Sequence, residues 1–276
     1  DLDIALDAFR IESADVNHQS ALAAAYMTGY RLAMIWAGAG VLWVAARAEV
    51  ANPANYDPNG WKVAYLVMAA SMIVGFITVL FTREPVPRPL APTKSVGEWL
   101  QTVLVEPFAD FFRRYGWNAV LVLALIATYR VSDIVMGIMA PPFYVDMGYS
   151  KDEVAAISKI YGVIMTLVGA LLAGVLSVKI GVMRTLMLGA VLSAASNVLF
   201  SWLATRGHDV TALTLVISID NLSSGIAATS FIAYMSSLTS SGFTATQYAL
   251  FTSLYALPGK LVASQSGRIV EASARA

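Results

Sequence analysis

Charged residues with the spacing of a helix face open the chain. Asp3, Asp7 and Arg10 are four and three positions apart, so all three project from one side of a helix. A carboxylate pair beside an arginine can take up and release a proton, because burial and the neighbouring guanidinium pull its pKa in opposite directions. We predict that these residues line a polar pathway. The alternative is that Asp7 and Arg10 form a structural pair near a helix end.

A second group of charges stands inside otherwise apolar stretches. Arg31 follows Gly29, and Arg130 and Asp133 follow Tyr129, itself a candidate for the pathway, in a later stretch. A charge near the bilayer centre costs at least ~2.5 kcal/mol on insertion scales, so it persists mainly where it faces a cavity or a partner. Arg31 could neutralise Asp3 or Asp7, or bind a carboxylate of a ligand through two hydrogen bonds. Arg130 and Asp133 are three residues apart and could satisfy each other.

Polar side chains in the last apolar stretches complete the set of candidates. Amides, a phenol and opposite charges suit sugar hydroxyls, peptide groups and ions, although such groups often only bond across membrane helices. Lys159, near a helix start, is interpreted as a side chain that reaches toward the surface. The candidates in this group are Asp220, Asn221, Gln247, Tyr248 and Lys260.

The composition identifies an all-α, polytopic membrane helix bundle. Apolar residues make up 58% of the 276 residues and charged residues 13%, against about 25% charged residues in a typical soluble domain. Eighteen basic and eighteen acidic residues balance, which gives no reason to expect a nucleic-acid partner. Cysteine is absent, so disulfides and thiolate metal sites are excluded.

The apolar runs predict helices of membrane-spanning length. About 20 residues cross the ~30 Å of hydrocarbon, and backbone groups in lipid must bond internally, which strands in an open sheet cannot do. Residues 52–60 are dense in turn formers and predict a loop. The predicted helices are a partial one at 1–11 and spans at 21–46, 61–81, 117–140, 153–178, 184–204, 211–237 and 245–265.

The segment 82–116 differs from its surroundings. It begins with a proline-rich, extended stretch (Pro85, Pro87, Pro89 and Pro92). Apolar residues then recur at helical spacing among charges over 96–113, which predicts an amphipathic helix at the membrane surface. The predicted domains are therefore the remainder of an N-terminal helical lobe at 1–81, a linker at 82–116 and an incomplete C-terminal lobe at 117–276.

Basic residues predict the orientation. Lys and Arg concentrate in cytoplasmic loops of membrane proteins. The linker therefore lies in the cytoplasm, because it carries Arg83, Arg88, Lys94, Arg113 and Arg114.

Motifs of soluble enzymes are missing from the sequence. It has no phosphate-binding glycine loop, no histidine pair at metal spacing and no Gly-x-Ser-x-Gly turn. We therefore expect no enzyme activity, catalytic residue, metal site or cofactor. An ion gradient is then the expected energy source for any transport.

Several segments carry a resemblance to known transporters. Gly174–Arg184 forms a short basic loop between two predicted helices. This loop and the long cytoplasmic linker between two helix groups resemble the two-lobed architecture of the major facilitator superfamily. Four further segments are Asp3–Arg10, Gly29–Leu32, Ala245–Leu250 and Ala256–Lys260. Together these four resemble the muropeptide permeases of AmpG type and their relatives in the peptide/acetyl-coenzyme A transporter family.

The resemblance implies a function and a place in the cell. It implies a multi-pass transporter of a bacterial inner membrane that imports N-acetylglucosamine–anhydro-N-acetylmuramic acid peptides with protons for cell-wall recycling. Acetyl-coenzyme A or another polar anion is an alternative cargo, and a membrane sensor without transport is an alternative of another class. It also implies that 1–11 end a fourth helix and that the first three helices and the twelfth are missing. Apolar side chains of 21–46 and 61–81 should then be more exposed than those of 153–178.

Overall fold

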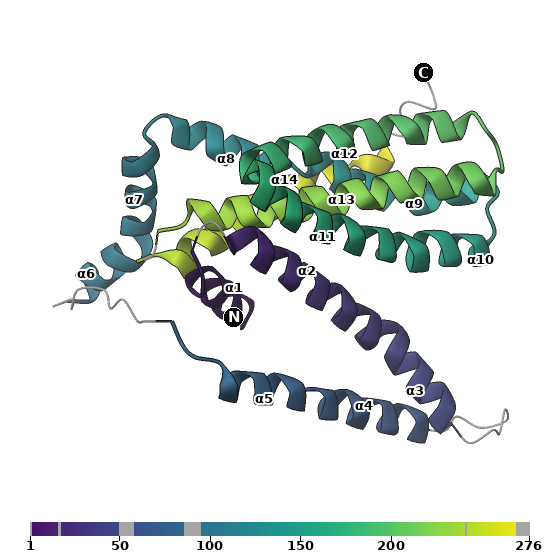
Figure 1. Cartoon of the computed structure of the whole chain (residues 1–276), viewed down its shortest axis with the longest axis horizontal. Helices are drawn as coiled ribbons and strands as arrows, with labels where there is room; N and C mark the ends of the chain where they lie inside the picture. Colours follow the sequence, from purple (N-terminus) through teal and green to yellow (C-terminus); the bar gives the residue numbers. More distant parts are fainter. Residues whose placement is uncertain (1, 16–17, 50–57, 86–94, 241, 269–276) are drawn as a thin grey trace. The chain divides into compact units, whose positions relative to one another are not determined.

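The computed structural model describes residues 2–15, 18–49, 58–85, 95–240 and 242–268. Within these ranges the regular elements are all helices, as the sequence predicts (Figure 1). Most of the predicted loop at 52–60 lies outside the described residues. So do three of the four linker prolines, Pro87, Pro89 and Pro92. The helices of the first part are α1 (Leu2–Glu12), α2 (Gln19–Ile35), η2 (Trp36–Gly40), α3 (Val41–Ala48), α4 (Asn59–Ser71), α5 (Ile73–Phe81), α6 (Val96–Leu100), η3 (Gln101–Val105) and α7 (Glu106–Tyr115).

The C-terminal helices follow the predicted spans closely. They are α8 (Asn118–Thr128), α9 (Val131–Asp146), α10 (Lys151–Val154), η4 (Ala155–Tyr161), α11 (Gly162–Ile180), α12 (Val182–Ala204), α13 (Val210–Leu238) and α14 (Thr244–Ser264). The stretches η2, η3 and η4 are π-helical turns that continue the helices beside them.

Six helices of the described residues are long and apolar enough to cross a membrane: Gln19–Ala48, Asn59–Phe81, Asn118–Asp146, Lys151–Ile180, Val182–Ala204 and Val210–Leu238. The predicted span at 245–265 forms α14 but is not among the six. Its Thr, Ser, Gln and Tyr side chains lower its hydropathy. The prediction of a helix there is confirmed, and its crossing of the membrane stays a prediction.

Side-chain caps explain where several helices begin. The Asp209 carboxylate accepts hydrogen bonds from the backbone N–H groups of Thr211 and Ala212, both at 3.0 Å, at the start of α13. Ser150 and Glu153 form a reciprocal capping box at the start of α10. Such caps bond N–H groups that have no partner inside the helix.

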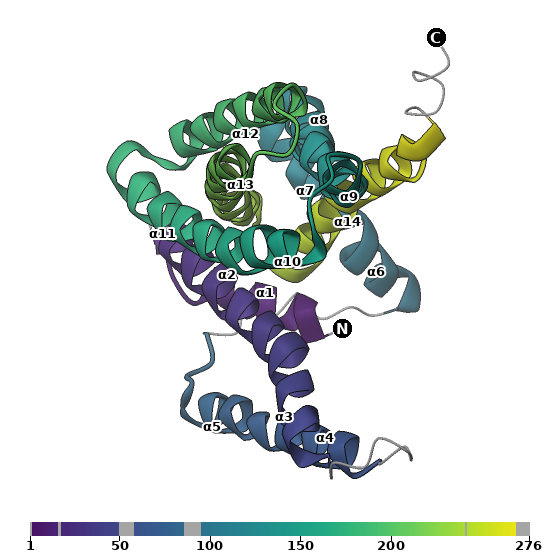
Figure 2. The same cartoon turned by 90° about the vertical axis from the view of Figure 1, so that its right-hand side faces the viewer.

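The chain divides into two compact units, residues 1–25 with 86–276 and residues 26–85. In the larger unit, α13 lies between α11 and α12, and the three helices run side by side (Figures 1 and 2). Glycines permit this close approach, because a Cβ on Gly225 would overlap the carbonyl oxygen of Thr166 on α11. On the other side of α13, a Cβ on Gly189 would lie 2.8 Å from the Cα of Ala227. Small residues at helix crossings are typical of membrane bundles.

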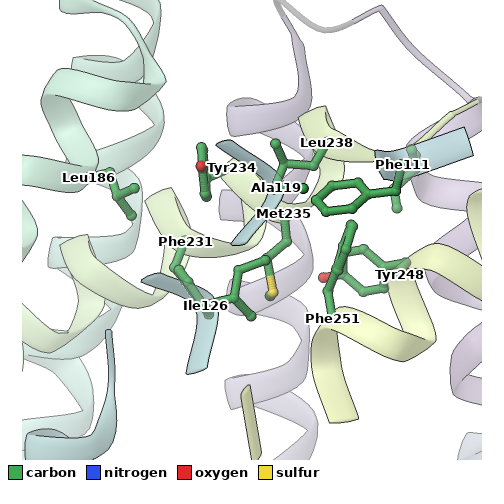
Figure 3. Close-up of a cluster of buried hydrophobic side chains, with 11 residues drawn as sticks. Phe111, Ala119, Ile126, Leu186, Phe231, Tyr234, Met235, Leu238, Tyr248 and Phe251 are labelled. Atoms are coloured by element: carbon green, nitrogen blue, oxygen red, sulfur yellow. The ribbon is translucent and has the colours of Figure 1, made fainter. Parts of the chain in front are cut away.

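An aromatic cluster joins α7 and α8 to α12, α13 and α14 (Figure 3). The ring of Phe111 on α7 packs against Phe251 on α14, with centroids 5.2 Å apart. Both side chains are buried, with 2% and 0% of their surface exposed. The helix predicted within the linker is therefore present, and Phe111 of α7 anchors it to the C-terminal helices.

Exposure follows the predicted contrast between the two ends of the chain. Buried residues make up 6% of the most apolar stretch in Gln19–Ala48 and in Asn59–Phe81, against 33% in Lys151–Ile180. The prediction that apolar side chains of the first two spans are more exposed is confirmed. The domain boundaries at 81 and 116 stay predictions, although residues 1–25 pack with the C-terminal helices.

Candidate functional site

The three charges of α1 differ in burial. Asp3 is exposed, Asp7 has 15% of its side chain exposed, and Arg10 has 6%. Arg10 Nη2 lies 3.4 Å from Asp7 Oδ1, Nη1 donates to Ser236 Oγ on α13 at 3.1 Å, and the guanidinium carbon lies 5.4 Å from the ring centroid of Tyr248 on α14. Arg10 therefore fastens α1 to α13 and α14. Sequence analysis did not predict Ser236 as the partner of Arg10, because Ser236 is a single serine in an apolar helix.

The predicted pathway roles of Asp3 and Asp7 stay predictions. Asp7 has a cationic partner three residues away, which fits the alternative of a structural pair equally well. Arg31 lies on α2 in the smaller unit, residues 26–85. Its predicted pairing with Asp3 or Asp7 would join the two units and also stays a prediction.

The predicted span 117–140 is interrupted at Tyr129 and Arg130, between α8 and α9. Arg130 leaves the helical conformation, with φ −112° and ψ 11°. Asp133 stands in the first turn of α9, where the helix dipole favours a carboxylate, and its Oδ2 lies 3.2 Å from Arg130 Nε. The predicted Arg130–Asp133 pair is thus present, and the break at its arginine was not predicted.

Two serines extend this pair into a polar cluster, which we call the C-terminal polar cluster. Arg130 Nη2 donates to Ser224 Oγ on α13 at 3.2 Å. One turn earlier on α13, Asp220 Oδ1 accepts a hydrogen bond from Ser196 Oγ on α12 at 3.0 Å. The cluster therefore consists of Arg130, Asp133, Ser196, Asp220 and Ser224 from three helices.

Asn221 and Tyr129 bond to neighbouring helices beside this cluster. Asn221 Oδ1 accepts from Thr166 Oγ1 on α11 at 3.0 Å, and its Nδ2 donates to the Ile217 carbonyl oxygen. Tyr129 donates to the Leu186 carbonyl oxygen at 2.7 Å and stacks on Phe231 with ring centroids 4.8 Å apart. Both side chains connect helices within the bundle.

Gln247 is buried between α7 and α14, and its predicted pathway role stays a prediction. It is 1% exposed, and its Nε2 donates to the Pro107 carbonyl oxygen at 2.8 Å and to Asp110 Oδ2 at 3.0 Å. Its Oε1 accepts from Arg114 Nη2 at 3.1 Å and from the Ser240 backbone N–H at 2.8 Å. The amide therefore holds α7 against α14 and the turn before α14.

The lysines and the hollow beside α7 stand apart from the polar cluster. Lys159 and Lys260 are exposed, while Gly259 packs against Ile134. A hollow of about 190 Å³ between α7, α8 and α14 is lined mostly by apolar side chains such as Phe108 and Leu250. It does not suit a polar ligand.

Sequence comparisons identify the family of the chain. The profile described as Major Facilitator Superfamily matches residues 4–263. The chain belongs to the Major Facilitator Superfamily. It is accordingly a multi-pass membrane protein of a transporter family, and the AmpG-type resemblance seen in the sequence is confirmed by its relatives.

The relatives of the chain are bacterial proteins. The chain is 33% identical over 269 residues to a protein named AmpG 4 from Rickettsia conorii, covering 97% of the chain and 62% of that relative. It is 31% identical over 271 residues to the anhydromuropeptide permease of Escherichia coli K12, covering 98% of the chain and 52% of that relative. The chain thus spans about half to three-fifths of the length of these relatives.

Proposed function

We propose that the protein takes part in the proton-coupled import of muropeptides through a bacterial inner membrane. One observation carries the proposal: opposite charges and hydroxyl groups from α9, α12 and α13 meet inside a membrane bundle. Buried charges are costly unless they pair or serve a pathway. The similarity to a permease for anhydromuropeptides supports this cargo.

The proposed pathway uses charges of both predicted lobes. In alternating-access carriers the substrate binds near the midplane, between the lobes. We place Asp3, Asp7 and Arg31 on the N-terminal side and Arg130, Asp133 and Asp220 on the C-terminal side. The linker 82–116 would then lie in the cytoplasm between lobes 1–81 and 117–276.

Uptake by the full-length protein tests the proposal. Proteoliposomes should accumulate radiolabelled muropeptide when an inward proton gradient is imposed. Asp7→Asn should abolish gradient-driven uptake while leaving insertion intact, and Arg31→Ala should do at least as much harm because it would leave a carboxylate uncompensated. Asp152→Asn, at an exposed position of α10, is the matched control.

Competition separates the cargo from its alternatives. Excess unlabelled muropeptide should block uptake of the label, and acetyl-coenzyme A should not. If acetyl-coenzyme A blocks uptake of the label and muropeptide does not, acetyl-coenzyme A becomes the proposed cargo. Absence of uptake at every pH would contradict transport and favour a sensor.

A further inference from the structure

Asp220 differs in its partners from Asp7 and Asp133, the other partly buried carboxylates of the predicted pathway. Its carboxylate accepts one hydrogen bond from the neutral hydroxyl of Ser196. Among the residues that the structure describes, no lysine, arginine or histidine nitrogen lies within 4.0 Å of it. Asp7 and Asp133, by contrast, each have an arginine within that distance.

Arg130 is a positive charge that interacts electrostatically with Asp220. It pairs with Asp133 at 3.2 Å and donates to Ser224, which lies on the same face of α13 one turn from Asp220. Arg130 and Asp133 are both close enough to Asp220 to interact with it electrostatically. Two carboxylates therefore face one guanidinium.

The presence of two carboxylates beside one guanidinium has an electrostatic consequence. An ionised carboxylate inside a bundle needs a compensating charge, because a neutral hydroxyl offsets only part of the lost hydration. One guanidinium can compensate one carboxylate fully. The other carboxylate is then most stable when it carries a proton.

We propose that Asp220 is the carboxylate that binds and releases the coupling proton, and that Arg130 is the counter-charge which it shares with Asp133. The proposal rests on the proposed function and deepens it. When Asp220 loses its proton to water in the pathway, its negative charge attracts Arg130 away from Asp133 and Ser224. Because Arg130 stands at the break between α8 and α9, this exchange moves α9 relative to α13.

The other titratable groups near the cluster do not take this role. Tyr144 of α9 interacts electrostatically with Asp220, and Tyr129 with Arg130 and Asp133, but a neutral phenol supplies no charge to offset. The helix α12 contributes the hydroxyl of Ser196. From η4, Lys159 is exposed and makes no ion pair within 4.0 Å among the described residues.

Infrared difference spectroscopy can observe the proton directly. The full-length protein, reconstituted without substrate, is titrated with pH while the carbonyl band of protonated carboxylic acid is followed. Near neutral pH exposed carboxylic acids are ionised, and Asp220→Asn should remove the band that remains there. Asp7→Asn should leave that band, because Asp7 has its own arginine. A band that persists near neutral pH in Asp220→Asn would overturn the assignment.

Asp133→Asn keeps the proposal testable if Asp220→Asn fails to fold. Without Asp133, Arg130 becomes available to Asp220 and favours its ionised form. The midpoint of the titrating band should therefore move to lower pH by one unit or more. An unchanged midpoint would overturn the sharing of Arg130.

Transport measurements separate this inference from the proposed function. Asp220→Asn should lose at least ten-fold of the stimulation of muropeptide uptake by a proton gradient. If gradient-driven uptake survives in Asp220→Asn, the assignment is wrong while the proposed function stands. If the wild type carries no muropeptide yet Asp220→Asn removes the band, the proton site stands and the proposed cargo fails.

Discussion

Gln247 Nε2 lies 2.8 Å from the backbone carbonyl oxygen of Pro107, a residue 140 positions earlier in the chain. The same amide bonds to Asp110 and Arg114, so one side chain secures α7 to the start of α14. With Phe111 packed on Phe251 beside it, the contact combines a buried amide with aromatic packing. Helix α7 of the linker therefore packs on the C-terminal bundle.

Replacing Gln247 by leucine should release α7. The change leaves buried polar groups of α7 without a partner, which costs about 1–3 kcal/mol. We expect a lower melting temperature for the full-length protein in detergent and faster tryptic cleavage at Arg113 and Arg114. Gln265→Leu, at an exposed position just after α14, should change neither. Equal behaviour of the two variants would contradict the anchoring role.

Arg10→Ala should destabilise the packing of α1 on α13 and α14. It leaves Asp7 buried without its partner and removes the bond to Ser236, at a cost of about 3 kcal/mol. The double variant Asp7→Ala with Arg10→Ala should recover part of this loss, since no uncompensated charge then remains. Thermal unfolding of the four proteins measures the coupling between the residues. Additive effects would show that the pair is not coupled.

Gly225→Ala should disrupt the crossing of α11 and α13. The new Cβ would overlap the Thr166 carbonyl oxygen and lie 2.9 Å from the Ala170 backbone nitrogen, and overpacking of this kind costs about 1–3 kcal/mol. The matched control is Gly137→Ala on α9, where nothing lies within 4 Å of the added atom. That variant should gain roughly 0.5–1 kcal/mol from helix propensity. Chemical unfolding in mixed micelles would compare the two, and a tolerated Gly225→Ala would refute the tight crossing.

Tyr129→Phe should cost only about 1 kcal/mol, the contribution of one hydrogen bond to the Leu186 carbonyl oxygen. Stacking on Phe231 is retained. Tyr129→Ala should cost about 2–3 kcal/mol, because it also removes a large, partly buried ring. Muropeptide uptake by Tyr129→Phe at the wild-type rate would support a packing role. Loss of uptake in a stable Tyr129→Phe protein would place the hydroxyl in the pathway instead.

The sequence predicted the elements well because apolar length and helical spacing depend on local composition. It also paired Arg130 with Asp133, since residues three apart in a helix are neighbours. It missed the break at Tyr129 and Arg130, because neither residue is a glycine or a proline.

Sequence analysis predicted least well the hydrogen bonds between residues on distant helices. Gln247 was predicted to line the pathway because its amide suits sugar hydroxyls and peptide groups, and that role stays a prediction. Its actual partners lie 133 to 140 positions away on α7. Ser196 and Ser236 were missed for the same reason: a lone serine in a membrane helix is common, and only packing shows which arginine or aspartate it contacts.

The glycine contacts on both sides of α13 also affect how motion in this protein can be measured. Helices in contact through backbone atoms at Gly225 and Gly189 cannot slide without overlap, so α11, α12 and α13 should keep fixed mutual distances throughout a transport cycle. Spin labels at the exposed Val168 of α11 and Val198 of α12 would then define an internal frame of reference. Displacements of a third label on another helix could be read against that pair in a single sample.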